Sequence, residues 1–297
     1  MKKRFPIFWG LLLLVLFVNL SLSHSEEAPN QTQPPPSASN PTSKGDTSKV
    51  VAMVLGKEIL FSQIEPDQRL IETSKQQMSA EQLTEAVREY QREQITTLVF
   101  GPLLEKYTSD HNIAPTQEEI DGFIKAMHEG RQNQIKQWKA QEEELLKELN
   151  SGSLAEEKKK ETSQKLEMIR GFISEYEHID ATGQTNEQIP IGEADIAKQF
   201  VRAWKINKSL YEQYGGRVIF QQAGPEPIDA YRTFLEEKEK GGAYKIYDPQ
   251  LKEVFWEYFV NDQMHTFYSK EDGGKFFDKP WWLTQNVQGV QNTSDKL

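Results

Sequence analysis

The chain has 297 residues, no cysteine and a formal net charge of −10 at pH 7. The absence of cysteine excludes disulfides, thiolate-ligated metals and thiol catalysis. The acidic balance argues against nucleic acid as a partner, because binding to phosphates depends on clustered Lys and Arg. The chain contains no P-loop, dinucleotide fingerprint or metalloprotease motif, so we expect no nucleotide, metal or other cofactor.

Residues 1–25 have the layout of a secretory signal peptide. Three basic residues precede an apolar stretch from Phe5 to Leu22, and serines lie at its end. The alternative is an uncleaved membrane anchor, because about 18 apolar residues is near the lower limit for a spanning helix. We favour cleavage, and we therefore expect a periplasmic protein that contacts the membrane only transiently, through the signal peptide.

Residues 26–48 are rich in Pro, Ser, Thr, Asn and Gln and have almost no apolar side chains. Such a segment cannot bury enough surface to offset the entropy lost on ordering. We therefore predict a disordered linker here and a disordered tail over residues 284–297. The folded part should run from about Lys49 to Leu283.

The segment Val50–Ile64, VVAMVLGKEILFSQI, predicts two short strands followed by a helix. Its β-branched apolar run is typical of a buried strand. Gly56 can adopt the positive φ of a tight turn, which we place at Gly56-Lys57. The Ser62–Glu65 spacing fits a capping box for a helix that begins near Ser62.

Helices dominate the next part of the chain. A short helix is predicted over residues 67–77. The pairs Ser79–Gln82 and Thr116–Glu119 fit capping boxes for two longer helices. Between them, Gly101-Pro102 should kink or end the first of the two long helices.

The strand–turn–strand VVAMVLGKEIL and the later helix with ITTLVFGPLLEKYTSDHNIAPTQEEIDGFI form a recognisable order. It resembles the N-terminal chaperone domain of the SurA, PrsA and PpiD group of exported folding factors. Members of that group have a "gi.vt.eEi...i" signature after the long helix, which Asn112–Ile120 matches. The resemblance covers about Val50–Met127 and implies a helical domain over residues 49–130.

Two positions depart from the pattern of that group. Leu55 stands where an Asn is usual before the turn glycine, and Gly101-Pro102 interrupts the long helix.

Residues 131–180 predict a charged helical hairpin, or arm, that is broken at Asn150–Ser153. Apolar residues recur along it, among them Trp138 on the first helix and Tyr176 on the second. The arm is either a solvated surface hairpin or a device that clasps partners. We favour the solvated hairpin, because runs of charge usually mark solvated faces.

Residues 181–283 predict further helices with short strands at Arg217–Gln221 and Ala243–Tyr247. In the related chaperones, C-terminal segments pack back onto the N-terminal domain. By analogy, the predicted helix Leu251–Phe259 would complete the core that begins at Val50.

This C-terminal part is dense in aromatic residues, with 19 of the chain's 31 between residues 200 and 282. We favour a core built from these rings. The alternative is that some rings are exposed and bind apolar segments of client proteins. The candidate client-binding residues are Phe255, Trp256, Phe259, Trp281 and Trp282.

No constellation of residues predicts catalysis. None of the five histidines has a metal-ligand partner at a suitable spacing, and for His265 we favour a structural or exposed role over a catalytic one. Relatives often carry a parvulin-type prolyl isomerase domain, whose motifs are missing here. A degenerate isomerase core over Arg217–Tyr247 remains an alternative.

The sequence thus predicts a mainly α-helical fold with a small β-hairpin, a helical arm and an aromatic-rich C-terminal part of helices and short strands. The resemblance implies an exported chaperone-like protein that binds unfolded or nascent envelope proteins, both secreted and outer-membrane, without catalysis. Two alternatives are a scaffold or assembly factor for one envelope partner and a parvulin-type isomerase with a degenerate domain.

Overall fold

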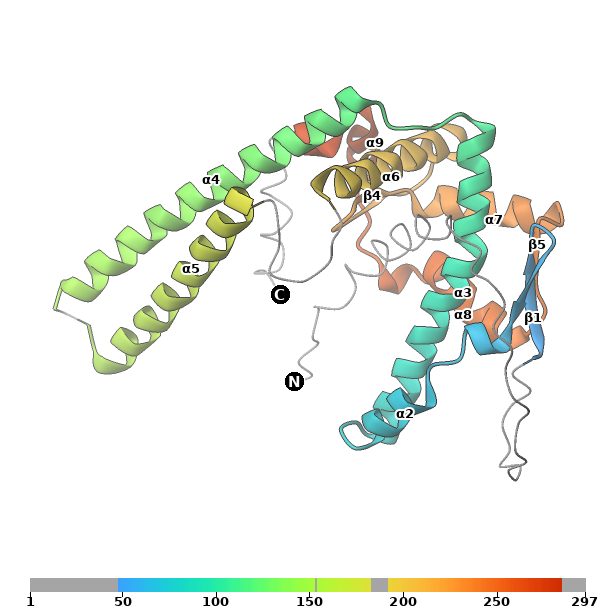
Figure 1. The fold of residues 1–297 in the computed structure, drawn as a ribbon, viewed down its shortest axis with the longest axis horizontal. Helices are drawn as coiled ribbons and strands as arrows, with labels where there is room; N and C mark the ends of the chain where they lie inside the picture. Colours follow the sequence, from blue (N-terminus) through green and yellow to red (C-terminus); the bar gives the residue numbers. More distant parts are fainter. Residues whose placement is uncertain (1–47, 153, 183–191, 285–297) are drawn as a thin grey trace, which may run out of the picture. The chain divides into compact units, whose positions relative to one another are not determined.

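The computed structural model describes residues 48–152, 154–182 and 192–284. The predicted signal peptide, nearly all of the predicted linker and the tail after Thr284 lie outside these residues. Within them the chain is mainly α-helical with a small antiparallel sheet, as predicted (Figure 1). The chain forms two compact units. Unit 1 holds residues 48–114 and 203–278, and unit 2 holds residues 115–202 and 279–284.

Unit 1 begins with a β-hairpin of β1 (Val50–Val54) and β2 (Lys57–Leu60). Its two turn residues, Leu55 and Gly56, have φ of 47° and 79°. Positive φ at both positions is the geometry of a type I′ turn, whose twist suits a two-residue hairpin. The turn therefore lies one residue earlier than the predicted Gly56-Lys57, and Lys57 already pairs with Val54.

The predicted capping box at Ser62 is wrong. A 3₁₀ turn, η2 (Phe61–Gln63), follows β2, and the first α-helix, α2 (Gln68–Lys75), is capped by Asp67. The reason is Pro66, which disfavours helical backbone at the residue before it. No helix that starts at Ser62 can therefore continue through the proline.

The next helix, α3 (Ala80–Asp110), begins with the predicted Ser79–Gln82 capping box. It continues through Gly101-Pro102, so the proline does not end it. Residues spaced along one face are buried on both sides of the proline, which keeps this face against the core. They include Ile95, Val99, Leu103 and Tyr107.

The rest of unit 1 comes from the C-terminal part of the chain. Its elements are the second half of α6 (Glu193–Tyr214), β3 (Ile219–Gln221), β4 (Gly224–Glu226), α7 (Ile228–Lys240), β5 (Tyr244–Ile246), α8 (Pro249–Val260) and α9 (Lys270–Asp278). Strand β5 pairs antiparallel with β1, so the sheet order is β2-β1-β5. The sequence reading did not predict β4 and α9.

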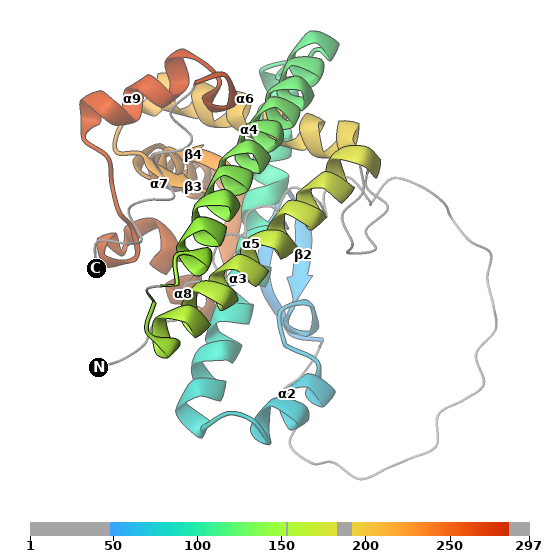
Figure 2. The ribbon, with the colours of Figure 1, turned by 90° about the vertical axis from the view of Figure 1, so that its left-hand side faces the viewer.

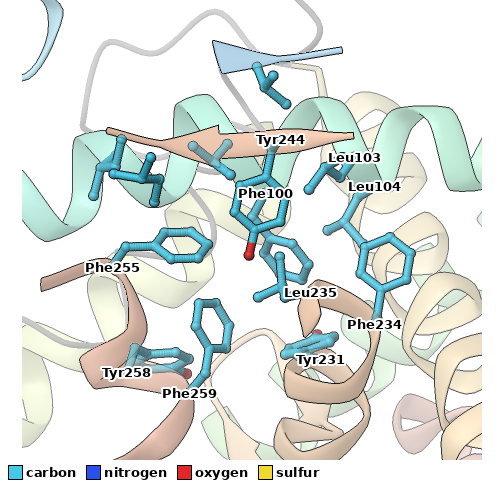
Figure 3. Packing of buried hydrophobic residues seen from close by; sticks show 14 of the residues in the cluster. Phe100, Leu103, Leu104, Tyr231, Phe234, Leu235, Tyr244, Phe255, Tyr258 and Phe259 are labelled. Atoms are coloured by element: carbon cyan, nitrogen blue, oxygen red, sulfur yellow. The ribbon is translucent and has the colours of Figure 1, made fainter. Parts of the chain in front are cut away.

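One hydrophobic core joins these two parts of unit 1. Figure 3 shows side chains of α3, β5, α7 and α8 pointing toward one another. The ring of Phe100 on α3 lies 5.1 Å from that of Tyr231 and 5.5 Å from that of Phe259. Helix α8 thus contributes to the same core as β1. This is the arrangement that we predicted for the helix Leu251–Phe259.

Unit 2 is built on a pair of long helices. Helix α4 (Gln117–Asn150) starts at the predicted Thr116–Glu119 capping box, and α5 (Glu156–Thr182) runs back along it (Figures 1 and 2). Helix α4 is continuous past residue 130, where we placed a domain boundary. The division of the chain therefore differs from the predicted one, because a single helix supplies both the end of the proposed domain and the start of the arm.

Candidate functional site

Two of the rings predicted to bind clients lie in the core of unit 1. Phe255 is 0 % exposed and Phe259 is 3 % exposed, and their ring centroids are 5.5 Å apart. Trp256, on the same helix, is partly buried and packs against this core. The alternative of exposed rings is therefore wrong for Phe255 and Phe259, because α8 turns both toward α3 and β5.

The two tryptophans near the end of the described chain are also buried. Trp281 and Trp282 form the short 3₁₀ helix η4 (Trp281–Leu283) in unit 2 and are 7 % and 8 % exposed. The Trp282 ring lies 5.1 Å from that of Phe123 on α4, and the Trp281 ring lies 6.3 Å from that of Phe200. These aromatic partners, distant in sequence, make them core residues and not an open surface.

Exposed apolar side chains occur at several places in the described part of the chain, and one such place is the helical arm formed by α4 and α5. The Trp138 ring stacks on that of Phe172 at 5.3 Å and meets that of Tyr176 edge-on at 4.7 Å. Phe172 is 44 % exposed, and Met168, one turn before it, is 54 % exposed. We call the surface formed by Trp138, Met168, Phe172 and Tyr176 the arm patch.

The arm patch lies along the seam that joins the two helices, because the Trp138 ring of α4 packs on Phe172 and Tyr176 of α5. That seam is filled by Ile135 of α4 and by Leu166 and Ile173 of α5, all of which are buried. Phe172 also helps to join the two helices through its stack on Trp138, although 44 % of Phe172 stays exposed. This structural role of Phe172 does not account for the exposed part of its ring or for the exposure of Met168, which is 54 % exposed.

Two ion pairs flank the arm patch and cancel the charge at its margins. Lys139 Nζ lies 2.7 Å from Glu177 Oε1, and Arg170 Nε lies 2.6 Å from Glu142 Oε1. Such exposed pairs each contribute about 1 kcal/mol or less to stability. Their effect here is to neutralise four of the charges near the patch.

The sequence reading missed the arm patch as a surface. It assigned Trp138 and Tyr176 to apolar faces of the arm but did not single out Met168 and Phe172. The available signal was their i, i+4 spacing, which places both on one side of α5 away from Leu166 and Ile173.

Unit 1 contains a buried polar cluster around Glu226, which is 2 % exposed. The Tyr258 hydroxyl donates to Glu226 Oε2 at 2.8 Å. Burial raises the pKa of Glu226 to about 8, and the hydrogen bond from Tyr258 opposes this rise without cancelling it. The Tyr231 hydroxyl donates to Asn207 Oδ1 at 2.5 Å, and Asn207 Nδ2 donates to the Pro225 carbonyl at 2.9 Å.

His265 lies beside this cluster. Its Nε2 is 2.6 Å from the Tyr258 carbonyl oxygen, and burial lowers the pKa of the imidazole. This position agrees with the structural role favoured for His265. The described residues contain no group of three or more His, Asp or Glu side chains placed to hold a metal ion.

The segment Arg217–Tyr247, the proposed site of a degenerate isomerase core, forms a small two-stranded sheet and contributes a third strand to the sheet of the N-terminal hairpin. Strands β3 and β4 make a two-stranded ladder, whereas β5 leaves the segment to pair with β1.

Comparisons of the chain with protein-family models, with curated proteins and with solved structures found no match. In the described part of the chain, none of the helices combines the length and the apolarity that a membrane span requires.

Proposed function

We propose that the chain is an exported chaperone-like protein that binds unfolded or partly folded envelope proteins through the arm patch. The observation that carries the proposal is the exposure of Met168 and of Phe172, whose ring stacks on that of Trp138. A Met and aromatic surface adapts to many apolar sequences, because thioether and ring contacts need no fixed hydrogen-bond partner. Binding would be weak and tolerant of client sequence.

The surroundings of the arm patch support this proposal. Both helices are otherwise highly charged, and the ion pairs Lys139–Glu177 and Arg170–Glu142 lie beside the rings. A charged surface keeps the free protein soluble while the patch offers apolar contact. The resemblance of Val50–Met127 to exported chaperones supports the same function.

The test is suppression of aggregation of a chemically unfolded outer-membrane protein, followed by light scattering without nucleotide. We expect the full chain to suppress aggregation and the double variant Met168→Gln with Phe172→Gln to require several-fold more protein. Because Phe172 is only partly exposed and stacks on Trp138, the variant should lose about 1–2 kcal/mol of stability, less than the truncation of a core aromatic costs. Circular dichroism checks that it is folded.

Leu70→Gln is the matched control, since Leu70 on α2 is 61 % exposed and lies in unit 1. It removes an even more exposed apolar side chain from another surface and should leave suppression unchanged. Equal suppression by the double variant and the unmodified chain would refute the role of the arm patch. If the unmodified chain did not suppress aggregation at several-fold molar excess, the chaperone function would be refuted. A pull-down that gave one stoichiometric folded partner would favour a scaffold.

A further inference from the structure

Glu226 ends strand β4 and is buried with a single hydrogen-bond donor. The Tyr258 hydroxyl of α8 reaches Oε2 at 2.8 Å, whereas Oε1 has no hydrogen-bond partner among the described residues. An ionised carboxylate in such a place is costly, because a buried charge needs a cation or several donors. The protonated acid has no such cost.

The carboxyl group lies where several elements of unit 1 meet. Its neighbour Pro225 accepts a hydrogen bond from Asn207 of α6, and Asn207 in turn accepts one from Tyr231 of α7. With Tyr258 of α8, this network ties α6, α7 and α8 to the strand β4. A charge buried at Glu226 therefore disturbs the contact between β4 and α8, the helix that completes the core.

The ionisable groups around the carboxyl are mostly neutral or already paired. Tyr258 and Tyr231 face it from α8 and α7, and β3 has no ionisable side chain. The positive charge of Arg92 on α3 acts on Tyr258, but Arg92 forms ion pairs with Glu257 and Glu89. Helix α9 packs against β4, and its ionisable side chains include the exposed ion pair Asp272–Lys275. His265 contacts the backbone carbonyl of Tyr258.

We propose that Glu226 is a proton-dependent latch, which fastens α8 to β4 while the carboxyl group is protonated and releases it when the proton is lost. The protonated acid accepts the Tyr258 hydrogen bond without a charge in the core. Loss of the proton strengthens the Tyr258 hydrogen bond but puts a negative charge in the core that has no second donor among the described residues, and the cost of burying this charge is the larger of the two effects. Helix α8 should therefore stay packed on β4 at neutral and mildly acidic pH, and it should separate from β4 more often at alkaline pH.

The direction of the pH dependence follows from the pKa. Burial raises the pKa of Glu226 from 4.5 to about 8, so the folded state binds a proton that the unfolded state releases. The stabilisation is complete below pH 4.5 and is lost as the pH rises through 8. Between pH 6.5 and 9 the equilibrium constant for opening should rise on the order of 30-fold.

Hydrogen exchange of the α8 amides, read by mass spectrometry and corrected for the intrinsic pH dependence, measures this opening in the full chain. The window above pH 6.5 avoids protonation of His265, which has the opposite effect on stability. We expect α8 protection to fall about 30-fold in the unmodified chain over this window. Glu226→Gln should keep α8 protection constant, whereas Glu58→Gln, an exposed site on β2, should behave as the unmodified chain.

Equal pH dependence in Glu226→Gln and in the unmodified chain would overturn the proposal. A measurement on the unmodified chain covers the case in which the variant does not fold. In a carbon-13 NMR titration of the glutamate carboxyl groups, one carboxyl should titrate near pH 8. Titration of every glutamate below pH 6 would also overturn the proposal.

Discussion

Phe255 tests whether α8 belongs to the core of unit 1 or carries an apolar surface for clients. Its side chain is 0 % exposed, and its ring lies 5.9 Å from that of Tyr244 on β5 and 5.5 Å from that of Phe259. Replacing a buried Phe with Ala removes the ring and leaves a cavity, which lowers the free energy of unfolding by about 3–5 kcal/mol. Phe255→Ala should therefore destabilise unit 1 by this amount.

The assay is equilibrium unfolding in urea, followed by circular dichroism and by tryptophan fluorescence. Val260→Ala is the control, since Val260 is on the same helix but 46 % exposed, and its change should stay within about 0.5 kcal/mol. A loss below about 1 kcal/mol for Phe255→Ala would refute the burial of this ring in a well-packed core.

Three further predictions concern local features. Leu55→Asn should raise the free energy of unfolding by roughly 1 kcal/mol in urea titrations, because Asn tolerates the positive φ at this turn position; a loss of stability would contradict the turn geometry. Thr116→Ala should lower the free energy of unfolding by about 1 kcal/mol, and Thr116→Ser should lower it by much less. Equal losses in the two variants would argue against the capping hydrogen bond at the start of α4. Burial lowers the pKa of His265, so stability should fall as the pH drops below 6.5; acid titration of unfolding should show a shallower fall for His265→Gln, and an unchanged fall would exclude His265 as its source.

Features set by neighbouring residues were predictable from the sequence. The capping boxes at Ser79–Gln82 and Thr116–Glu119 were found because their hydrogen bonds join residues three positions apart. The same pattern at Ser62 failed because Pro66 overrides it. A capping pattern therefore predicted a helix correctly only where no nearby residue, such as a proline, prevents helical backbone.

Features set by distant residues were harder to predict. The pairing of β5 with β1 joins segments almost 200 residues apart and was not predicted, because the analogy with related chaperones concerned only the helix Leu251–Phe259. The burial of Trp281 and Trp282 depends on Phe123 and Phe200, which no spacing rule connects to them. The buried state of Glu226 likewise depends on Tyr258, 32 residues away.

Site-specific photo-crosslinking tests the proposed client contact most directly. A photoreactive amino acid at position 172 of the full chain is mixed with one defined outer-membrane protein, either unfolded or folded, and position 70 serves as the reference site. Binding through the arm patch predicts crosslinks from position 172 to the unfolded protein and far fewer to the folded one. Crosslinks from position 70 alone, or equal labelling of the folded and unfolded client, would contradict it.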